Sequence, residues 1–471
     1  MAVTRRGAPP DVTYDVTVIG AGVVGAAIAR ELARHPGLRI ALAEAADDVG
    51  EGTSKANTAI LHTGFDAVPG SLESRLVREG QAMLAAYAAE SGIPVEPVGA
   101  LLVAWDDDQL AALPDLLSKA ERNGQDAARL LGAAEVRARE PHLGPGALGA
   151  LDVPGESIIC PWSTTLAYAT QAVRAGVDLL LNCRVVGVGS AGEAHLLTTS
   201  RGALRTRYLV NAAGLHADTV DRMLGHDAFT VTPRRGQLIV YDKFARDLVQ
   251  HILLPVPTAL GKGVLVAPTV YGNVLLGPTA EELDDKSATG TTAEGIAALR
   301  ERGHRILPEL LDEEVTAVYA GLRAATGQDD YRIGAHKEQR YVTVGGIRST
   351  GLTASLAIAA HVTELLAATG LELSGPRDLE PVRMPNLGEA FPRPYQRADL
   401  VAADPAYGEI VCHCERVTRG EIRDALTATV PPGSPDGLRR RTRARGGRCQ
   451  GFYCGAEVRE LYERGAEMGT G

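Results

Sequence analysis

The order of apolar and polar residues near the N-terminus predicts a strand, a tight turn and a helix. The run VTVI ends at Ile19 and is typical of a buried strand, and apolar residues with helical spacing follow from Ala26 to Ala33. Between them lies the glycine-rich stretch GAGVVG, Gly20 to Gly25. A second apolar run, RIALAE, ends at Glu44 and predicts a neighbouring strand. The segment therefore has the pattern of a βαβ unit.

Later segments predict two kinds of sheet and a small helical unit. The stretches YLVNAAGLHAD, from Tyr208, and VTVGGIRSTGLTASLAIAAHV, from Val342, again place a strand before a glycine turn. The blocks RGQLIVYDK and GKGVLVAPTVYGNVLLGPTA instead alternate apolar and polar residues between turns, which is typical of antiparallel strands. The proline-rich residues 374–394 lack periodicity and predict a linker. Beyond them, TRGEIRDAL, with Thr418 three residues before Glu421, and GAEVRELYERG predict two helices.

Composition and charge narrow the class of protein. With 471 residues, 45% of them hydrophobic and 23% charged, the chain can bury a large core in two or three structural units. A net charge of -10 argues against general nucleic-acid binding. We find no apolar stretch that approaches the roughly 20 residues needed to span a bilayer, although peripheral membrane association stays open. The apolar segment near the N-terminus is better explained by the glycine turn than by a signal peptide, so we expect a cytoplasmic protein.

The glycine turn has the residue types that a dinucleotide site needs. Gly20 permits a tight turn, Gly22 lets the backbone approach a pyrophosphate, and Gly25 lets helix and strand pack closely. The N-terminus of the helix offers unpaired N–H groups to the anion. Glu44, nineteen residues past Gly25, is placed to bind ribose hydroxyls, and an acid there argues against a 2'-phosphate. The ligand is therefore FAD or NAD, with a βαβ unit that binds no nucleotide as the alternative.

The residues after the second predicted strand decide between the two cofactors. The stretch GEGTSKANTAILHTGFDAVPGSLESRL, from Gly50, resembles the corresponding segment of FAD-dependent oxidoreductases of the D-amino-acid oxidase and glycerol-3-phosphate dehydrogenase superfamily. The resemblance continues through the stretches from Tyr208 and Val342 and covers most of residues 14–375. It implies an FAD-dependent oxidoreductase of the α/β class, with a discontinuous Rossmann-like FAD-binding domain and an inserted, mainly antiparallel β-sheet substrate domain.

The same resemblance implies the domain boundaries. The FAD-dependent oxidoreductase domain would span residues 1–375, and a linker, residues 376–405, would lead to a small helical domain, residues 406–471. The pieces of the first domain are about 14–95, 150–230 and 340–375 for FAD binding and about 96–149 and 231–339 for the substrate domain.

The resemblance also implies which residues contact FAD. They lie in the glycine turn, at the end of the second strand and in the three matched segments. These residues are Gly20, Gly22, Gly25, Glu44, Thr53, Ser54, Asn57, Ala213, Gly214, Gly346, Gly351, Leu352 and Thr353.

Three further residues are candidates for the substrate chemistry. The flavin takes the hydride, so the protein has to orient the substrate and accept a proton. His62 lies in the segment that in the family runs beneath the flavin ring, and the near-neutral pKa of histidine suits a general base. The alternative is a histidine that only hydrogen-bonds the flavin or a carbonyl group. Arg323 and Arg348 offer planar guanidinium groups that can clamp a carboxylate or phosphate, although arginines are more often solvated surface residues.

The resemblance leaves two substrate classes open. Glycerol-3-phosphate dehydrogenases place an arginine shortly after the H-x-G motif, whereas Phe65 and Asp66 follow Gly64 here. The stretch HTGFDAVPGSLESRL also looks like L-2-hydroxyglutarate oxidases, but GGIRSTGLTAS and the cysteine-rich tail look more like the glycerol-3-phosphate branch. Both resemblances imply a small anionic substrate. The favoured reaction is oxidation of sn-glycerol 3-phosphate to dihydroxyacetone phosphate, and an L-2-hydroxy acid or an amino acid is the alternative substrate.

Four of the six cysteines lie in the last sixty residues. Their pattern is Cys412-x-Cys414, then 34 residues, then Cys449-x4-Cys454. It resembles the bacterioferritin-associated-ferredoxin-like 2Fe-2S domain that is fused to some anaerobic glycerol-3-phosphate dehydrogenase subunits. Four thiolates are what a 2Fe-2S cluster requires, and a zinc site is the alternative.

A basic stretch lies between the two cysteine pairs, with six arginines from Arg439 to Arg448. Beside an anionic cluster, these side chains would offset its charge, raise its potential or steer an electron-transfer partner. A solvated face is the plain alternative. His413, between two of the cysteines, is expected to face solvent.

Together these features predict a dehydrogenase with two redox centres. FAD would oxidise the substrate, and the 2Fe-2S cluster would pass electrons singly to an acceptor protein or a quinone reductase subunit. A simple oxidase, whose flavin reacts directly with oxygen, would have no use for the cluster. The alternative from another class is an electron-transfer or redox-sensing flavo-iron-sulfur subunit that acts on no small substrate.

Overall fold

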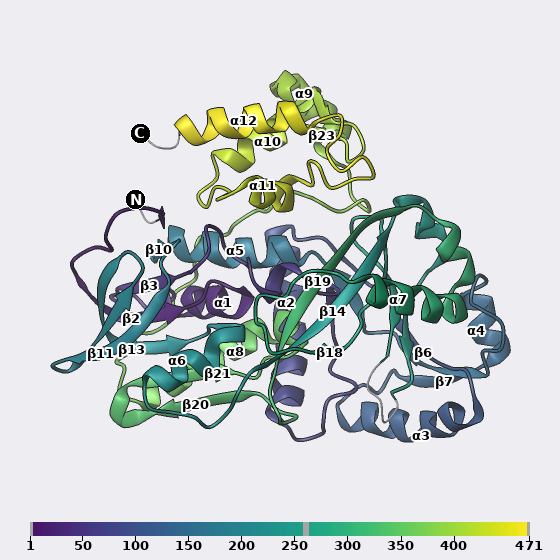
Figure 1. Ribbon diagram of the computed structural model, residues 1–471, viewed down its shortest axis with the longest axis horizontal. Helices are drawn as coiled ribbons and strands as arrows, with labels where there is room; N and C mark the ends of the chain where they lie inside the picture. Colours follow the sequence, from purple (N-terminus) through teal and green to yellow (C-terminus); the bar gives the residue numbers. More distant parts are fainter. Residues whose placement is uncertain (1–2, 258–262, 469–471) are drawn as a thin grey trace.

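Figure 1 shows the computed structural model of the chain, which describes residues 3–257 and 263–468. Two large β-sheets lie side by side, and a smaller unit of helices lies across them. Gly261 and Lys262, at which one of the predicted antiparallel blocks starts, lie outside the described residues.

The first sheet contains the predicted βαβ unit. Its parallel strands run in the order β1, β10, β3, β2, β13 and β21, and β11, β12 and β20 add antiparallel pairs beyond β13. The parallel strands are apolar runs because helices or other strands cover both faces. The strands are β1 (Val3–Thr4), β2 (Thr13–Ile19), β3 (Ile40–Ala43), β10 (Asp178–Leu180), β11 (Val185–Ala191), β12 (Ala194–Thr199), β13 (Gly202–Asn211), β20 (Arg332–His336) and β21 (Tyr341–Gly345). β20 lies in a stretch predicted for the substrate domain, but it forms a hairpin with β21 and so joins this sheet.

Helices pack on this sheet in a tight group. α1 contacts α5 and α8, and α2 contacts α8. The helices are α1 (Val23–Leu32), α2 (Leu72–Ser91), α5 (Pro161–Arg174), α6 (Ala217–Met223) and α8 (Gly351–Ala368). Gly80 of α2 permits the closest approach, because a Cβ there would lie 2.5 Å from the carbonyl oxygen of Thr353 in α8.

Among the described residues, α8 is the one helix long and apolar enough to cross a membrane, with a mean hydropathy of 1.4 over 18 residues. Our sequence-based statement that no apolar stretch approaches this length is therefore wrong. More than half of α8 is buried inside the protein, where it packs between α1 and α2. Its apolar composition is that of a core helix of a globular protein.

The second sheet is mainly antiparallel, as predicted from the alternating blocks. Its order is β18, β14, β17, β16, β15, β6, β8 and β7, and β19 pairs with β14. Its strands are β6 (Ala100–Ala104), β7 (Arg129–Gly132), β8 (Gly149–Val153), β14 (Thr232–Tyr241), β15 (Ile252–Pro255), β16 (Leu265–Pro268), β17 (Val274–Gly277), β18 (Glu281–Glu282) and β19 (Val315–Ala325). The helices of this part are α3 (Asp107–Arg122), α4 (Ala133–Arg139) and α7 (Ala293–Ile306). A short third sheet contains β4 (Ile60–Leu61), β5 (Val95–Glu96) and β9 (Ser157–Ile159).

The C-terminal unit has a small core of its own around Cys412, Ile422 and Leu438. Its elements are α9 (Ala398–Ala403), β22 (Ile410–Cys412), β23 (Val417–Thr418), α10 (Arg419–Leu426), α11 (Pro435–Thr442) and α12 (Gly455–Met468). The predicted capping box of Thr418 and Glu421 is present at the start of α10, and α12 is the second predicted helix. α9 shows that the predicted linker contains ordered structure near its end.

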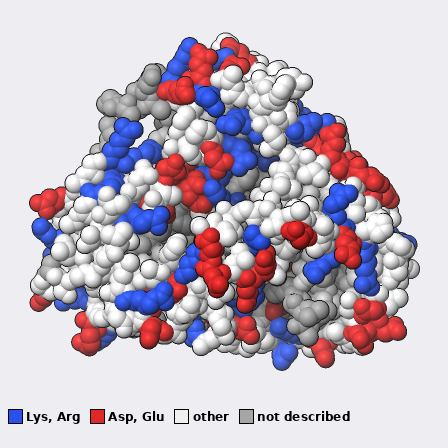
Figure 2. All heavy atoms as spheres, in the orientation of Figure 1, with Lys and Arg blue, Asp and Glu red and all other residues white. Residues whose placement is uncertain are grey.

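The arginine run holds this unit against the two sheets. Arg441 donates hydrogen bonds of 2.6 and 2.7 Å to the buried carboxylate of Asp48, and Arg440 lies 3.7 Å from the same carboxylate. Arg448 donates to Asp242, just after β14, at 2.9 Å. Acidic and basic side chains meet where the C-terminal unit joins the rest (Figure 2). These three arginines therefore pair with carboxylates across the junction, a role that the sequence analysis did not include, and the expected effect of the run on the cluster or a partner stays a prediction.

Candidate functional site

A cavity of about 1840 Å³, partly open to solvent, is lined by residues from both large sheets and from the C-terminal unit. It exceeds the roughly 300–1,000 Å³ of a typical small-molecule pocket. Among the residues that line it are these predicted FAD contacts: Gly20, Gly22, Gly25, Glu44, Thr53, Ser54, Asn57, Ala213, Gly214, Gly351 and Leu352. His62, Arg323 and Arg348 also line it. The cavity therefore brings together most of the residues that the sequence analysis singled out.

Two predicted FAD contacts lie outside this lining. Gly346 forms the turn after β21, with a φ of +65° that favours glycine. Thr353 is fully buried in α8, where its Oγ1 accepts a hydrogen bond of 3.0 Å from the backbone N–H of His62. Both residues are chain neighbours of lining residues, Ile347 and Leu352, rather than part of the lining.

The glycine turn between β2 and α1 requires its small residues. Gly20 has a φ of +99°, and a side chain there would meet the backbone beyond β13 at 2.6 Å. A Cβ on Gly25 would lie 1.9 Å from the carbonyl oxygen of Gly20, so strand and helix can pack this closely only with glycine. The backbone N–H of Val23, at the start of α1, donates to Ser54 Oγ at 2.9 Å. The helix N-terminus thus faces the cavity through polar groups.

Glu44 holds the glycine turn from the end of β3. Its Oε2 accepts a hydrogen bond of 2.7 Å from the N–H of Ala21, and its Oε1 accepts one of 2.8 Å from the N–H of Ala46. Burial raises the pKa of Glu44 above its usual value, against the effect of these N–H donors. The residue that the sequence analysis assigned to a ribose therefore also shapes the turn.

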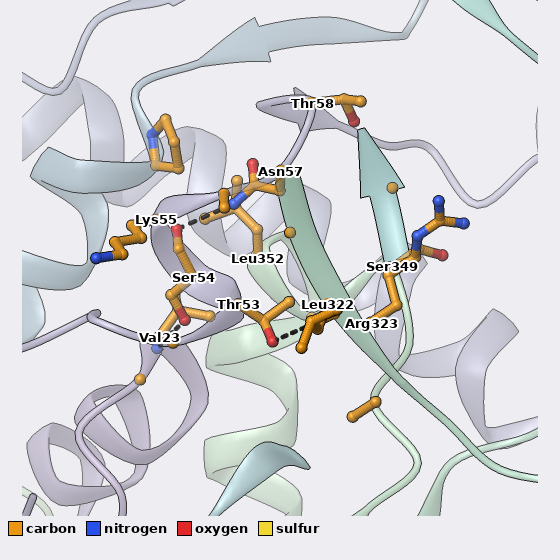
Figure 3. Close-up of a pocket in the computed structure, with 18 of the residues that line it drawn as sticks. Val23, Thr53, Ser54, Lys55, Asn57, Thr58, Leu322, Arg323, Ser349 and Leu352 are labelled. Carbon is orange, nitrogen blue, oxygen red and sulfur yellow. Dashed lines mark hydrogen bonds between the residues drawn. The ribbon is translucent and has the colours of Figure 1, made fainter. Parts of the chain in front are cut away.

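The segment of predicted FAD contacts after β3 is fixed against β19. It begins with a short 3-10 helix, η1 (Thr53–Lys55). Thr53 Oγ1 donates to the carbonyl oxygen of Leu322 at 2.7 Å, and Asn57 Nδ2 donates to the carbonyl oxygen of Ser54 at 3.0 Å (Figure 3). The first bond ties this segment to β19 of the second sheet, and the second bond fixes the local turn at one wall of the cavity.

His62 is held by a carboxylate that the sequence analysis missed. Its Nδ1 lies 3.0 Å from Oε2 of the fully buried Glu156. The N–H and Oγ1–H of Thr63 donate to the other carboxylate oxygen at 2.7 and 2.8 Å. Because an ionised carboxylate only accepts, the pair places the ring proton on Nδ1 and fixes the orientation of the imidazole. The sequence gives little indication of this role, because Glu156 is a single acidic residue before a short buried strand and belongs to no recognisable motif.

Arg323 is a partly buried cation on β19. Its Nη2 donates to the carbonyl oxygen of Thr279 at 2.7 Å, and no described carboxylate forms an ion pair with it. The residue directly opposite on β14 is Arg234, a second cation. Burial and the charge of Arg234 lower the pKa of Arg323 to about 10. An anion in the cavity would relieve this unfavourable environment.

Arg348 is already neutralised by carboxylates. Its Nη1 lies 3.0 Å from Asp329 Oδ1, and its Nη2 lies 3.0 Å from Glu73 Oε2. Glu73 lies in the first turn of α2 and also accepts a hydrogen bond of 2.6 Å from Thr350. Arg348 therefore has much less capacity for a further anion than Arg323.

The four C-terminal cysteines are brought together as two pairs. Cys412 contacts Cys454, and Cys414 contacts Cys449, each pair through its side chains. No three His, Cys, Asp or Glu side chains in the described part of the chain form a group that could hold one metal ion. Two pairs fit a 2Fe-2S cluster, with two thiolates for each iron, better than a single tetrahedral zinc ion.

Backbone N–H groups point at these sulfurs. Cys449 accepts hydrogen bonds from the N–H groups of residues 451–453, and although burial opposes its ionisation, these bonds and its partner cysteine lower its pKa. Burial raises the pKa of Cys412 to about 11, against N–H donors from Arg445 and Glu415. Arg445 adopts a left-handed backbone with a φ of +67°, which costs energy in an arginine. The loops are thus arranged to surround anionic sulfur with donors.

A family model described as FAD dependent oxidoreductase matches residues 15–365, most of the chain. The chain belongs to this family. A second model, described as a BFD-like [2Fe-2S] binding domain, matches residues 410–464 of this FAD dependent oxidoreductase. The cofactors are therefore FAD and a 2Fe-2S cluster, as predicted, and the zinc alternative is set aside.

The FAD dependent oxidoreductase is similar to three proteins that are named for an enzyme activity. It is 37% identical to a glycerol 3-phosphate dehydrogenase of Caloramator mitchellensis, over 97% of this chain and 95% of that one. It is 29% identical to the mitochondrial L-2-hydroxyglutarate dehydrogenase of Homo sapiens, over 57% of this chain and 61% of that one. The solved structure of L-alpha-glycerophosphate oxidase from Mycoplasma pneumoniae, with FAD bound, aligns with a TM-score of 0.72 and 28% identity, over 80% of this chain and 98% of that one. These likenesses confirm the predicted α/β fold class.

Proposed function

We propose that this FAD-dependent oxidoreductase oxidises sn-glycerol 3-phosphate to dihydroxyacetone phosphate. The observation that carries the proposal is Arg323, a partly buried cation in the same cavity as His62 that has no carboxylate partner among the described residues. A small anionic hydroxy compound supplies the missing charge. The likeness of almost the whole chain to a protein named glycerol 3-phosphate dehydrogenase favours a phosphate as that anion.

In this proposal Arg323 binds the phosphate of the substrate. A guanidinium group can donate two parallel hydrogen bonds to one phosphate, which fixes the orientation of the bound molecule. Arg348 is left out of this role, because Glu73 and Asp329 already pair with it. It instead fixes the start of α2 against the loop before β20.

The proton of the substrate hydroxyl is assigned to His62. When bound, FAD supplies the hydride acceptor. The contact with Glu156 holds the proton of the imidazole on Nδ1 and stabilises the ring after it has gained a second proton. Glu156 is thus a positioning residue that acts through His62.

The wall formed by the glycine turn, Glu44 and residues 53–57 is proposed to hold FAD. Gly20 and Gly25 are positions at which a side chain would clash, and Gly22 leaves the backbone open to a pyrophosphate. The first sheet then forms the FAD-binding domain and the second sheet the substrate domain. The predicted boundaries follow this division except at β20, which joins the first sheet, and at β8, which joins the second.

Electrons are proposed to leave through the 2Fe-2S cluster to an external acceptor. The glycerophosphate oxidase structure is covered over 98% of its length by 80% of this chain, so the C-terminal unit is an addition to the oxidase-like part. A cluster carries one electron at a time, which suits an acceptor protein or a quinone reductase subunit rather than oxygen. We place this reaction in the cytoplasm, with membrane contact only through the acceptor and no role for nucleic acid.

An anaerobic screen of flavin reduction tests the proposal. Purified protein with FAD and cluster is mixed with glycerol 3-phosphate, L-2-hydroxyglutarate, L-lactate and several amino acids, and the visible absorbance of the flavin is followed. Rapid bleaching with glycerol 3-phosphate alone is the expected result. Bleaching with L-2-hydroxyglutarate instead would transfer the assignment to a carboxylate substrate, and bleaching with none would favour an electron-transfer or sensing subunit.

A further inference from the structure

Three side chains from separate elements stack where the cavity meets the C-terminal unit. Trp162, in the first turn of α5, stacks on Tyr271, with ring centroids 4.9 Å apart and planes at 19°. The guanidinium carbon of Arg443 lies 4.4 Å from the centroid of the Tyr271 ring. Tyr271 and Arg443 are buried, and all three residues line the cavity. The stack thus extends from the cavity wall into the C-terminal unit.

The cavity end of the stack is fixed by hydrogen bonds. Trp162 Nε1 donates at 3.1 Å to the carbonyl oxygen of Lys55, in the segment of proposed FAD contacts. The hydroxyl of Tyr271 donates to the sulfur of Cys160 at 3.0 Å. Burial raises the pKa of Tyr271 well above its usual value, so the phenol stays neutral. Both rings therefore have one orientation.

The other end of the stack lies beside the cluster cysteines. Arg443 Nε donates to Glu415 Oε2 at 2.8 Å, and its Nη2 donates to Asn273 Oδ1 at 3.0 Å. Glu415 directly follows Cys414, and its backbone N–H donates to the sulfur of Cys412. One buried ion pair therefore separates the Tyr271 ring from two of the cluster ligands.

Other described contacts across this junction include polar contacts between cavity-lining residues, such as Arg440 with Glu51 and Gln450 with Thr316, and a cation–π contact of Arg448 with the exposed Phe244. Two of the ion pairs across the junction have a buried carboxylate and lie away from the cavity. Arg441 pairs with Asp48, and Arg448 pairs with Asp242. These ion pairs hold the C-terminal unit in place, but none of the four residues lines the cavity. The stack is the contact among the described residues that joins the cavity to the cysteine loops through packed aromatic groups.

We propose that Trp162, Tyr271 and Arg443 form the path by which electrons pass from the flavin site to the 2Fe-2S site. Electron transfer weakens with distance less steeply through packed atoms than across a solvent-filled gap. The stack fills the junction with polarisable rings and a cation held on one ring face. This proposal depends on the proposed function in one respect only: the substrate has to reduce the flavin.

The electron count is simple. Substrate oxidation leaves two electrons on FAD, and the oxidised cluster accepts one of them through the stack. The cluster then gives this electron to an external one-electron acceptor before it takes the second. One proton would leave the reduced flavin and the other, from the substrate hydroxyl, would leave His62, both for solvent, so no proton has to cross the stack.

The test compares Tyr271→Leu with Tyr271→Phe. Leucine fills much of the space without a π system, whereas phenylalanine keeps the ring and loses only the bond to Cys160. The flavin is reduced by a light flash with a soluble photoreductant, so that the result does not depend on the substrate. Flavin absorbance and the electron paramagnetic resonance signal of the reduced cluster are then followed in the same sample. Cluster reduction should lag behind flavin reduction in the Tyr271→Leu protein. The Tyr271→Phe protein should show no such lag and should behave like the wild type.

Control measurements exclude other causes of a lag, namely lost cofactor, an altered cluster potential and loosened docking of the C-terminal unit. FAD content, iron content and the equilibrium midpoint potential of the cluster should equal the wild-type values, so that a lag does not come from lost cofactor or altered driving force. Trp162→Leu should give a lag of its own and serves where Tyr271→Leu does not fold. Arg448→Ala removes the ion pairs with Asp242 and Glu314 and the contact with the Phe244 ring without touching the stack, and it should show no lag.

Two results would overturn the path. One is transfer at the wild-type rate in folded Tyr271→Leu or Trp162→Leu protein. The other is a lag in Arg448→Ala as long as that in Tyr271→Leu, because loosened docking would then explain both. Failure of the proposed substrate shows separately, as a flavin that glycerol 3-phosphate leaves oxidised while light still reduces it.

Discussion

Replacing Arg323 with alanine tests the proposed substrate class most directly. The side chain extends from β19 at the wall of the cavity (Figure 3), where its one described hydrogen bond goes to the carbonyl oxygen of Thr279. If the substrate anion binds here, alanine leaves that anion without its charged partner in a partly desolvated site. Binding and orientation should both suffer.

The size of the effect follows from the environment of the guanidinium. Burial and Arg234 lower the pKa of Arg323 to about 10, which corresponds to about 3 kcal/mol against the charged form, since one pKa unit is about 1.4 kcal/mol. A bound anion can recover a similar energy, and breaking a desolvated charge pair costs roughly 2 to 5 kcal/mol. For Arg323→Ala, kcat/KM should therefore fall about thirty- to several-thousand-fold, since about 1.4 kcal/mol is tenfold.

The assay is anaerobic stopped-flow reduction of the flavin over a range of glycerol 3-phosphate concentrations. FAD content and the cluster spectrum should stay at wild-type values, because Arg323 is assigned to neither cofactor. Arg323→Lys should recover only part of the loss, since a point charge lacks the planar fork of arginine. Arg129→Ala, which removes an exposed arginine paired with Glu135, is the matched control and should change nothing. Wild-type kinetics in Arg323→Ala would refute the assignment of the anion to this residue.

Three further substitutions test the other parts of the site. Glu156→Gln should slow flavin reduction at saturating substrate by roughly ten- to a hundredfold. The reason is that a hydrogen bond to a charged group contributes about 1.5–3 kcal/mol and that the amide holds His62 less firmly. An unchanged rate would remove Glu156 from the mechanism. Gly22→Val should abolish FAD binding, because even a Cβ there lies 3.2 Å from Ser54 Oγ and the branched side chain covers the pyrophosphate position. A normal flavin content in this variant would show that the turn serves packing alone. Cys449→Ser should lose the cluster, measured as iron content, because serine lacks the soft thiolate, and an iron content equal to that of the wild type would contradict this ligand assignment.

Features made by neighbouring residues could be predicted from the sequence. The glycine turn depends on Gly20 and Gly25, five positions apart, and the capping box depends on Thr418 and Glu421, three positions apart. Apolar periodicity likewise predicted both kinds of sheet. Local spacing carries this information because the backbone geometry of a turn, a helix end or a strand involves only a few residues.

Contacts between distant residues could not be predicted in this way. Glu156 meets His62 from 94 positions away, and Arg441 meets Asp48 from 393 positions away. An isolated acid or an arginine run has several possible partners, and only the packing of the sheets and the C-terminal unit selects one. Arg348 shows the same limit, since the carboxylates that neutralise it come from other parts of the chain.

The C-terminal unit supplies part of the lining of the large cavity, and this couples the two cofactor sites. Its contribution consists of Asp436, Arg439, Arg440, Arg443, Gly446 and Gln450. The same small unit contains the four cluster cysteines, two of which, Cys412 and Cys454, belong to its core. A change that disorders the cysteine loops would therefore also remove wall residues of the flavin cavity. The cluster domain is in this sense a structural part of the flavin site as well as an electron carrier.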